Sequence, residues 1–270
     1  MRETASARAM AEVIIVSDQD AAGAIVARDI ADLITRRPDA VLGLATGSTP
    51  LAVYRALAKI IADEAIDVSQ VRGFALDEYI GLEPGHPESY RAVITREVVE
   101  PLGLDPARVL VPGDNATSIQ TAGEEYEAAI REAGGVDVQI LGIGRTGHIG
   151  FNEPGSSLAS RTRVKTLTAP TRADNARFFD SADQVPMHCL TQGIGTILDA
   201  RHLFLLAFGE SKAEALAEAA EGPVTASSPG SAIQLHPHAT VIADEAAAAQ
   251  LTLTDYYRYA WDNKPDWQGI

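Results

Sequence analysis

Several features that many proteins of this size carry are scarce in this chain of 270 residues. It has one cysteine, Cys189, which excludes an internal disulfide and a metal cluster built on several thiolates. No apolar run approaches the roughly 18 residues that span a bilayer, and the start lacks the basic and then apolar pattern of a signal peptide. These absences predict a cytoplasmic protein. Residues 1–11 have no periodic pattern and are predicted to be a loose leader, with Met10 as an alternative start, before one folded unit over residues 12–270.

Positive charge is scarce as well. Lys and Arg number 22 against 37 Asp and Glu, which gives a formal net charge of −15. Nucleic acid and anionic membranes are held by clustered cations, so the composition argues against both as partners. A small phosphorylated metabolite stays compatible with this charge, because it needs only a few local donors and backbone N–H groups can supply them.

What the chain does contain is an alternation of short apolar runs and amphipathic segments, which indicates βα units and an open, mainly parallel sheet. Between residues 155 and 165 the composition is polar and cationic and favours a solvated connection. Strands are predicted over 12–16, 40–44, 71–76, 202–208 and 239–243, with another from Val136 to the glycines near 142; helices are predicted from Asp18 to Arg36, after Pro50, and over 89–99, 117–133, 171–179 and 256–261.

The glycine-rich stretch that follows the predicted strand at 136 carries one imidazole and one carboxylate, His148 and Glu153. Its glycines match the dinucleotide fingerprint G-x-G-x-x-G, but that fingerprint requires a helix directly afterwards, and Gly150 and Pro154 stand where the helix should be. The glycines therefore favour close approach of a small substrate to the backbone. For His148 on its own, a structural histidine is the competing interpretation.

Other polar residues also follow predicted strands, at the carboxyl edge where open parallel sheets bind ligands. The segment 46–50 joins a strand to a helix and predicts an anion cradle, although it lacks the P-loop pattern and an ordinary capped turn is the alternative. Asp77 and Glu78 follow the strand at 71–76, and only one of two adjacent acids is expected to face a cleft. Lys212 lies at another strand-to-helix junction, where a solvated lysine is the common case and a phosphate contact is the alternative.

Several of these segments carry longer motifs, and at this point the chain resembles a known family. From Val41 to Trp267 it is similar to the glucosamine-6-phosphate deaminases of the glucosamine/galactosamine-6-phosphate isomerase family. The resemblance implies a Rossmann-like three-layer α/β sandwich around a mainly parallel sheet in a single domain. It also implies hydrolytic deamination with isomerisation, from glucosamine 6-phosphate and water to fructose 6-phosphate and ammonia, with no metal or organic cofactor. The motifs are LATGSTP (44–50), LDEYIGL (76–82), HPESY (86–90), GHIGFNEP (147–154), SSLASRTRVKT (156–166) and NARFF (175–179).

The resemblance also assigns roles to individual residues. Asp77 would move a proton between C2 and C1 of the open-chain sugar, His148 would open the pyranose ring, and Glu153 would support the imidazole. Many members also have an acid two residues before this histidine, where the present chain has Thr146, so the role of that position is in question. The residues implied in phosphate binding are Thr46, Gly47, Ser48, Thr49, Arg177 and Lys212.

Some members of the family are hexamers activated by N-acetylglucosamine 6-phosphate bound between subunits. The residues that match this activator site are Ser156, Ser157, Arg163 and Lys165, and all four residue types are present. The regulated members also use their N-terminus in that site, whereas this chain has extra residues before Met10. A homo-oligomer and allosteric control are therefore expectations to be tested.

Two other functions compete with the deaminase hypothesis. A 6-phosphogluconolactonase shares the broader fold, but lactone hydrolysis gives no role to Asp77 in an aldose–ketose conversion. A sugar-phosphate sensor of a transcriptional regulator would need no catalytic set, and no helix-turn-helix segment or basic extension is visible. Release of ammonia from glucosamine 6-phosphate distinguishes the three.

Overall fold

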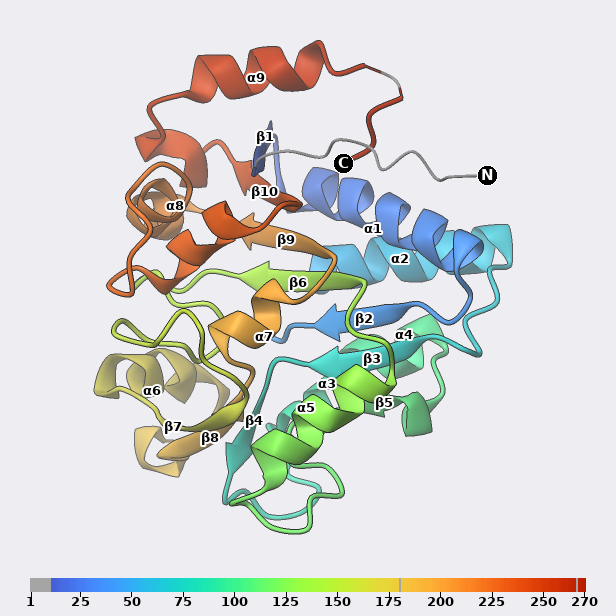
Figure 1. The fold of residues 1–270 in the computed structure, drawn as a ribbon, viewed down its shortest axis with the longest axis vertical. Coiled ribbons are helices and arrows are strands. Elements are labelled where there is room, and N and C mark those ends of the chain that lie inside the picture. The colour runs from blue at the N-terminus through green and yellow to red at the C-terminus, as the bar shows by residue number, and fades with distance from the viewer. Residues whose placement is uncertain (1–10, 180, 266) are drawn as a thin grey trace.

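The computed structural model describes residues 11–179, 181–265 and 267–270. The leader expected at residues 1–11 lies outside this part except for its last residue. Within the described residues, the strands form a seven-stranded parallel sheet and a three-stranded antiparallel sheet (Figure 1). The large sheet consists, in spatial order, of β1 (Glu12–Val16), β10 (Ala239–Asp244), β9 (His202–Ala207), β6 (Val138–Gly142), β2 (Val41–Leu44), β3 (Arg72–Ala75) and β5 (Val109–Leu110).

The central strands of the large sheet are apolar on both faces, as expected for a parallel sheet covered by helices on each side. Every residue of β9 and of β2 is buried, and β6 pairs with β9 so that Ile140 lies beside Phe204. This strand pattern confirms the α/β sandwich that the sequence predicts. Helices flank the sheet as α1 (Gln19–Arg36), α2 (Leu51–Glu64), α3 (Tyr90–Ile94), α4 (Glu100–Leu102), α5 (Ala122–Glu132), α6 (Ala169–Asn175), α7 (Ile194–Leu198), α8 (Ala213–Ala220) and α9 (Thr254–Asp262).

Two of the longest helices, α1 and α2, show how local sequence sets the packing. The side chain of Asp18 caps α1 by accepting a hydrogen bond from the N–H of Ala21 at 2.8 Å, as the sequence predicts. In the middle of α1, a Cβ on Gly23 would come within 2.7 Å of the backbone carbonyl of Ala52 in α2. Glycine at this position therefore lets the two helices approach closely.

The small sheet differs from the sequence prediction in two places. Residues 77–80 form a strand of their own, β4 (Asp77–Ile80), which pairs with β8 (His188–Thr191). The solvated connection expected over 155–165 is wrong at its end, because β7 (Arg163–Thr166) pairs with the other edge of β8. The polar composition of β7 is that of an edge strand, whose side chains stay partly in water while its backbone is paired.

The helix predicted from residue 117 is shorter, since α5 starts at Ala122.

The order of the strands creates a switch point between β2 and β6, which are neighbours in the sheet. From β2 the chain moves outward to β3 and β5, whereas from β6 it moves in the opposite direction to β9 and β10. The first strand of the chain, β1, pairs with β10 at that edge. The loops that follow β2 and β6 therefore diverge and leave a crevice at the carboxyl ends of the strands, where open α/β sheets bind ligands. The small sheet and α6 lie at this same end of the large sheet (Figure 1).

A second, small hydrophobic cluster fixes α6 and the small sheet near the crevice. It contains Tyr79, Phe151 and Cys189, with Tyr90 and Phe179 packed against them. The ring of Tyr79 lies 4.8 Å from that of Tyr90 and 5.8 Å from that of Phe179, measured between centroids. Because these residues come from β4, α3 and the segment after α6, the cluster ties together three elements that surround the crevice.

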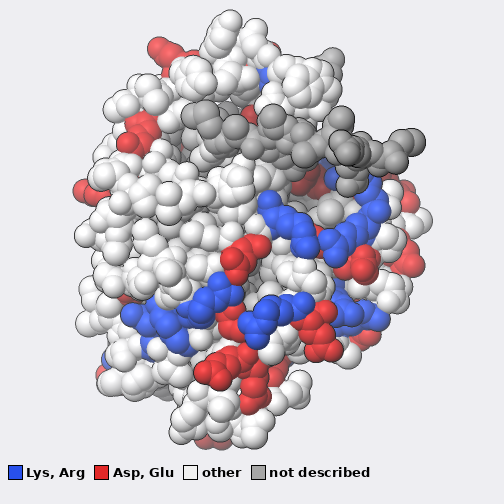
Figure 2. Space-filling view, in the orientation of Figure 1, with Lys and Arg blue, Asp and Glu red and all other residues white. Residues whose placement is uncertain are grey.

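Charged side chains of both signs are intermingled on the face shown in Figure 2. On this face, therefore, the net charge of −15 does not exclude local cationic sites. Among the described residues, no helix has the length and apolar character needed to cross a membrane.

Candidate functional site

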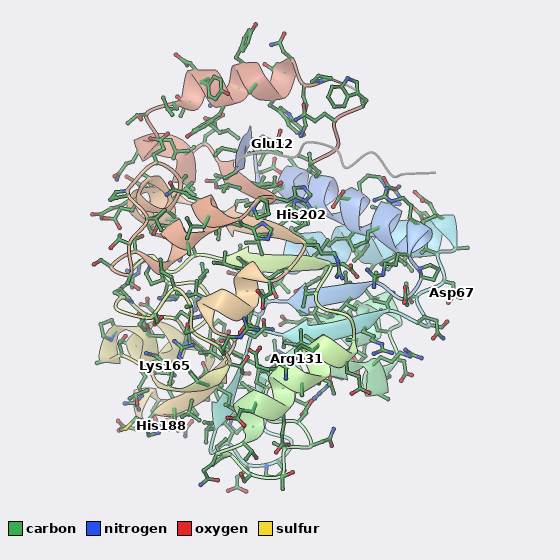
Figure 3. All side chains as sticks on the ribbon, in the orientation of Figure 1. Glu12, Asp67, Arg131, Lys165, His188 and His202 are labelled. Carbon is green, nitrogen blue, oxygen red and sulfur yellow. The ribbon has the colours of Figure 1, made fainter. Side chains whose placement is uncertain are left out.

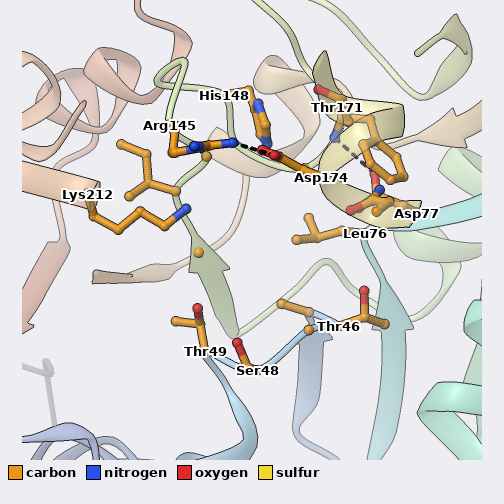
Figure 4. A pocket seen from close by; sticks show the side chains of 18 of the residues that line it. Thr46, Ser48, Thr49, Leu76, Asp77, Arg145, His148, Thr171, Asp174 and Lys212 are labelled. Atoms are coloured by element: carbon orange, nitrogen blue, oxygen red, sulfur yellow. Dashed lines mark hydrogen bonds and ion pairs between the residues drawn. The ribbon is translucent and has the colours of Figure 1, made fainter. Parts of the chain in front are cut away.

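A cavity of about 550 Å³ occupies the switch-point crevice (Figure 4). Four loops that follow β2, β3, β6 and β9 contribute to its wall, and α6 with the residues after it closes one side. The sequence-predicted residues Asp77 and His148 both line this cavity, as do the predicted phosphate ligands Thr46, Gly47, Ser48, Thr49, Arg177 and Lys212. The structure thus brings together eight side chains or backbone positions that are spread over more than 160 residues of sequence.

Asp77 lies where β3 runs into β4, and its side chain is 7% exposed. Burial raises its pKa to about 7, although hydrogen bonds from Thr191 and from the backbone N–H of Phe151, at 3.2 Å, favour the charged form. A carboxyl group with a pKa near 7 can both accept and return a proton at neutral pH. Gly150 leaves space beside it, since a Cβ there would lie 3.3 Å from Oδ1 of Asp77 and the backbone φ is +54°.

The neighbouring acid, Glu78, points away from the cavity. Its carboxylate accepts hydrogen bonds from the backbone N–H groups of Tyr79, Tyr90 and Arg91, at 2.7–2.9 Å. It thereby anchors the start of α3, whose Tyr90 lines the cavity. The prediction that only one of the two adjacent acids faces the cleft is confirmed.

His148 is held on the loop after β6 by its backbone and its neighbours. The N–H of Gly144 donates to the carbonyl of His148 at 2.9 Å, and the imidazole ring lies so close to Gly144 that a Cβ there would overlap it. Nδ1 of His148 is 2.8 Å from the hydroxyl oxygen of Thr146 and 3.4 Å from Oε2 of Glu153. Over residues 143–162, all of which the structure describes, the chain forms no helix after these glycines, whereas the dinucleotide fingerprint requires one directly afterwards.

Glu153 lies behind His148 and is 5% exposed. Its Oε2 accepts a hydrogen bond from the hydroxyl of Thr146 at 3.2 Å, and its Oε1 accepts from Thr168, also at 3.2 Å, and from Thr171. Burial raises the pKa of Glu153, but the hydrogen bonds from His148, Thr171 and Thr168 outweigh it and lower the pKa to about 2. Glu153 therefore stays ionised at neutral pH and joins the loop after β6 to the start of α6.

The predicted anion cradle forms the opposite wall of the cavity. Residues 45–50 turn from β2 into α2, with Gly47 at φ +91°, and the hydroxyl of Tyr54 holds the turn by donating to the carbonyl of Ala45 at 2.8 Å. The first N–H groups of a helix have no partner within it and carry the positive end of its dipole. Lys212 faces this turn across the cavity (Figure 4). Its pKa is lowered by burial and by the nearby Arg145 and Arg177.

The residues predicted for an activator site do not line the cavity. Arg163 and Lys165 alternate along β7 and are partly exposed, and Figure 3 shows Lys165 near His188 on the small sheet. Ser157 is exposed, whereas Ser156 is 3% exposed and its Oγ has no hydrogen-bond partner among the described residues. Their position is therefore separate from that of Asp77 and His148.

Sequence reasoning gave no role to four other residues of the cavity wall: Arg145, Asp174, Asn175 and Tyr90. Tyr90 and Asn175 lie inside motifs that carry the family resemblance, so the sequence motifs could have indicated both residues. The pairing of Arg145 with Asp174 joins residues 29 positions apart and depends on how α6 packs. Among the described residues, no three His, Cys, Asp or Glu side chains are grouped as metal ligands would be.

Comparisons with known proteins agree with this architecture. Residues 18–242 match the family described as glucosamine-6-phosphate isomerases/6-phosphogluconolactonase. A glucosamine-6-phosphate deaminase of Bifidobacterium longum (strain DJO10A) is 66% identical over 97% of this chain and all of the relative, and one of Streptomyces coelicolor is 60% identical over 96% of this chain and all of the relative.

Among solved structures, a monomeric glucosamine-6-phosphate deaminase superposes with a TM-score of 0.85 at 42% identity, covering 88% of this chain and 99% of that protein. A 6-phosphogluconolactonase from Trypanosoma cruzi superposes with a TM-score of 0.68 at 18% identity, covering 90% of this chain and 97% of that protein, and this likeness shows the shared fold. The identity to the deaminases and the match over most of the chain decide the family. This chain belongs to the family of glucosamine-6-phosphate isomerases and 6-phosphogluconolactonases.

Proposed function

We propose that this protein is a glucosamine-6-phosphate deaminase, which converts glucosamine 6-phosphate and water to fructose 6-phosphate and ammonia. The relatives of that name support the proposal, at 60–66% identity over nearly the whole chain. The observation that carries it is the shared cavity. A carboxyl group with a pKa near 7, an imidazole, the anion cradle and the cations Arg177 and Lys212 all line it. Its volume of about 550 Å³ lies in the range of small-molecule sites.

The first step in this proposal is opening of the pyranose ring by His148. The carboxylate of Glu153 only accepts hydrogen bonds, so the hydroxyl of Thr146 donates to Glu153. The oxygen of that Thr146 hydroxyl then accepts a hydrogen bond from Nδ1–H of His148. This arrangement leaves Nε2 of the neutral ring as the acceptor. Nε2 then takes the proton of the O1 hydroxyl and delivers it to O5 as the C1–O5 bond breaks, which yields the open-chain aldehyde.

Asp77 carries the second step, the transfer of hydrogen between C2 and C1. Its carboxylate removes the proton from C2 of the 2-amino aldehyde, and the C1 oxygen takes a proton from solvent, which gives an enolamine. Asp77 then returns the proton to C1, leaving an iminium at C2. Water adds to C2 and ammonia leaves, so that C2 becomes the ketone of fructose 6-phosphate. A pKa near 7 suits a group that must act as base and then as acid.

The phosphate of the substrate would lie against the segment 46–49, with Arg177 and Lys212 supplying positive charge. The phosphate does not react, but holding it fixes the distance from C1 and C2 to Asp77. Binding energy from a remote group is converted to rate in this way, because the reacting atoms are oriented before the chemical step.

The oligomeric and regulatory predictions belong to the same proposal. We infer an activator site for N-acetylglucosamine 6-phosphate at Ser156, Ser157, Arg163 and Lys165, in a homo-oligomer of six chains. It is supported by their position outside the cavity and by the two partly exposed cations on β7. Sedimentation velocity and substrate-saturation curves test it: a monomer with hyperbolic kinetics, unchanged by N-acetylglucosamine 6-phosphate, contradicts it. A cytoplasmic location is proposed as well, since phosphorylated sugars are retained inside cells, and cell fractionation tests it.

The function itself is tested by measuring fructose 6-phosphate and ammonia released from glucosamine 6-phosphate. Equal amounts of both products are expected from the wild-type protein. Asp77→Asn is expected to lose at least about 10²-fold in kcat, the usual contribution of one acid–base group. Hydrolysis of 6-phosphogluconolactone is assayed in parallel. Turnover of the lactone without release of ammonia would assign the chain to the other branch of its family.

A further inference from the structure

An ion pair that the mechanism does not use joins two sides of the cavity. Nη2 of Arg145, on the loop after β6, contacts Oδ1 of Asp174 in α6, and both residues line the cavity (Figure 4). Their side chains are 59% and 48% exposed, so the pair is open to solvent and to an incoming ligand.

The surroundings of this pair are rich in positive charge. The ammonium of Lys212 lies within electrostatic range of Arg145, Arg177 and Asp174, and its pKa is lowered by burial and by the two arginines, while Asp174 acts in the opposite direction. Asp174 is therefore a negative charge beside these three cations. The anion cradle at residues 46–49 lines the same cavity as these three cations, so the place proposed for the phosphate lies in the cavity that they share.

We propose that Arg145 is a third phosphate-binding cation. It pairs with Asp174 before substrate binds, and the phosphate of the substrate then replaces Asp174 as the partner of Arg145. This inference rests on the proposed function, because it concerns the phosphate subsite of the same cavity. It adds an exchange of partners to phosphate binding. The same exchange removes one contact between α6 and the loop that carries His148, while the hydrogen bonds of Thr168 and Thr171 to Glu153 remain.

The balance of charges favours this exchange. A phosphate monoester carries about −1.5 to −2 charges at pH 7 and offers three strong acceptor oxygens, whereas Asp174 offers one charge. A guanidinium binds phosphate with two parallel hydrogen bonds. Ion pairs with this much exposure are weak, so breaking the pair lowers phosphate affinity only by about two- to fivefold. Asp174 also repels the phosphate directly once it is released.

Binding of inorganic phosphate, measured by isothermal titration calorimetry at low ionic strength, tests the exchange in four proteins: wild type, Asp174→Asn, Arg145→Gln and the double variant. Asp174→Asn is expected to bind phosphate about three- to tenfold more tightly, because both the competition and the repulsion are removed. Arg145→Gln is expected to bind about three- to tenfold more weakly. The gain from Asp174→Asn is expected to be smaller when Arg145 is already Gln, since only the repulsion is then removed.

Matched controls separate this effect from a change in net charge. Glu245→Gln and Arg258→Gln remove the same charges from another exposed ion pair, which the structure places outside the cavity wall, and are expected to leave phosphate binding unchanged. Raising the ionic strength should reduce the differences among the four proteins. Unchanged binding in Arg145→Gln, or equal effects of Asp174→Asn in both backgrounds, overturns the inference. Phosphate binding needs no turnover, so an inactive wild type contradicts only the proposed function.

Discussion

The hydroxyl oxygen of Thr146 lies 2.8 Å from Nδ1 of His148. The same hydroxyl donates to Glu153, so that a neutral side chain stands between an imidazole and a carboxylate. An acid at this position would stabilise an imidazolium by charge, whereas threonine can only fix the tautomer and orientation of the ring. The negative charge in this part of the site is therefore supplied by Glu153, whose pKa of about 2 keeps it ionised.

Replacing Thr146 tests this division of roles. Thr146→Val keeps the shape but removes both hydrogen bonds and is expected to lower kcat by about tenfold, while Thr146→Ser keeps the hydroxyl and most of the activity. Thr146→Asp places a second carboxylate next to the imidazole, which favours its charged form over the neutral base that opens the ring, so kcat/KM at neutral pH should fall. Profiles of all three variants on glucosamine 6-phosphate provide the measurement. A wild-type rate and profile in Thr146→Val would exclude a positioning role for the hydroxyl.

Glu153 is expected to contribute to stability in a pH-dependent way. Its folded-state pKa of about 2 lies below the ordinary value of 4.5, so its contribution is present above pH 4.5 and is lost as the pH falls from there toward 2. The shift corresponds to on the order of 3 kcal/mol. In urea unfolding, Glu153→Gln should therefore be less stable than wild type at pH 6, and the difference should shrink at pH 3. A constant difference at both values would show that the carboxylate charge does not matter.

How far the sequence predicts this site depends on which contacts are local. Asp77, His148 and the segment 46–49 each follow an apolar strand, and the carboxyl ends of parallel strands meet at one edge, so their convergence follows from the pattern. The partners of Glu153 do not follow from it. Thr168 and Thr171 lie in a polar region, and their contacts depend on how α6 packs on the aromatic cluster around Tyr79.

The sequence prediction for the segment that forms β7 was wrong for a related reason. Arg163 and Lys165 read as solvated because composition reports the side chains, whereas the strand is formed by backbone pairing with β8. In the same way, the sequence predicts that Asp77 follows the strand at 71–76, and the structure makes it the first residue of another strand. Edge strands and pairings between distant segments are the features that a local pattern does not contain.

Gly144 offers a test of how precisely the imidazole must lie. A Cβ at this position would overlap the ring of His148, so Gly144→Ala is expected to displace the ring and lower kcat by about 10²-fold, with little loss of fold. Gly142→Ala is the matched comparison, because its Cβ would meet Thr49 at an ordinary 3.7 Å, and it should lose far less activity. Circular dichroism and kcat are measured for both. Equal losses in the two variants would attribute the effect to the cavity wall in general.

The burial of Asp77 predicts a conflict between activity and stability. Its folded-state pKa of about 7 lies above the ordinary value of 3.8, so the folded protein binds more protons than the unfolded one between these values. Stability therefore falls as the pH rises from about 4 through 7, by up to about 4 kcal/mol from this group alone. Asp77→Asn removes the buried charge and should unfold at a higher urea concentration than wild type at pH 8, with little difference at pH 4. The same titration predicts that the acid limb of kcat/KM lies near pH 7, since only the ionised carboxylate removes the proton from C2. If Asp77→Asn is inactive yet no more stable than wild type at pH 8, the carboxylate is not held at a cost in the folded state, and its raised pKa cannot be the source of its proton-transfer activity.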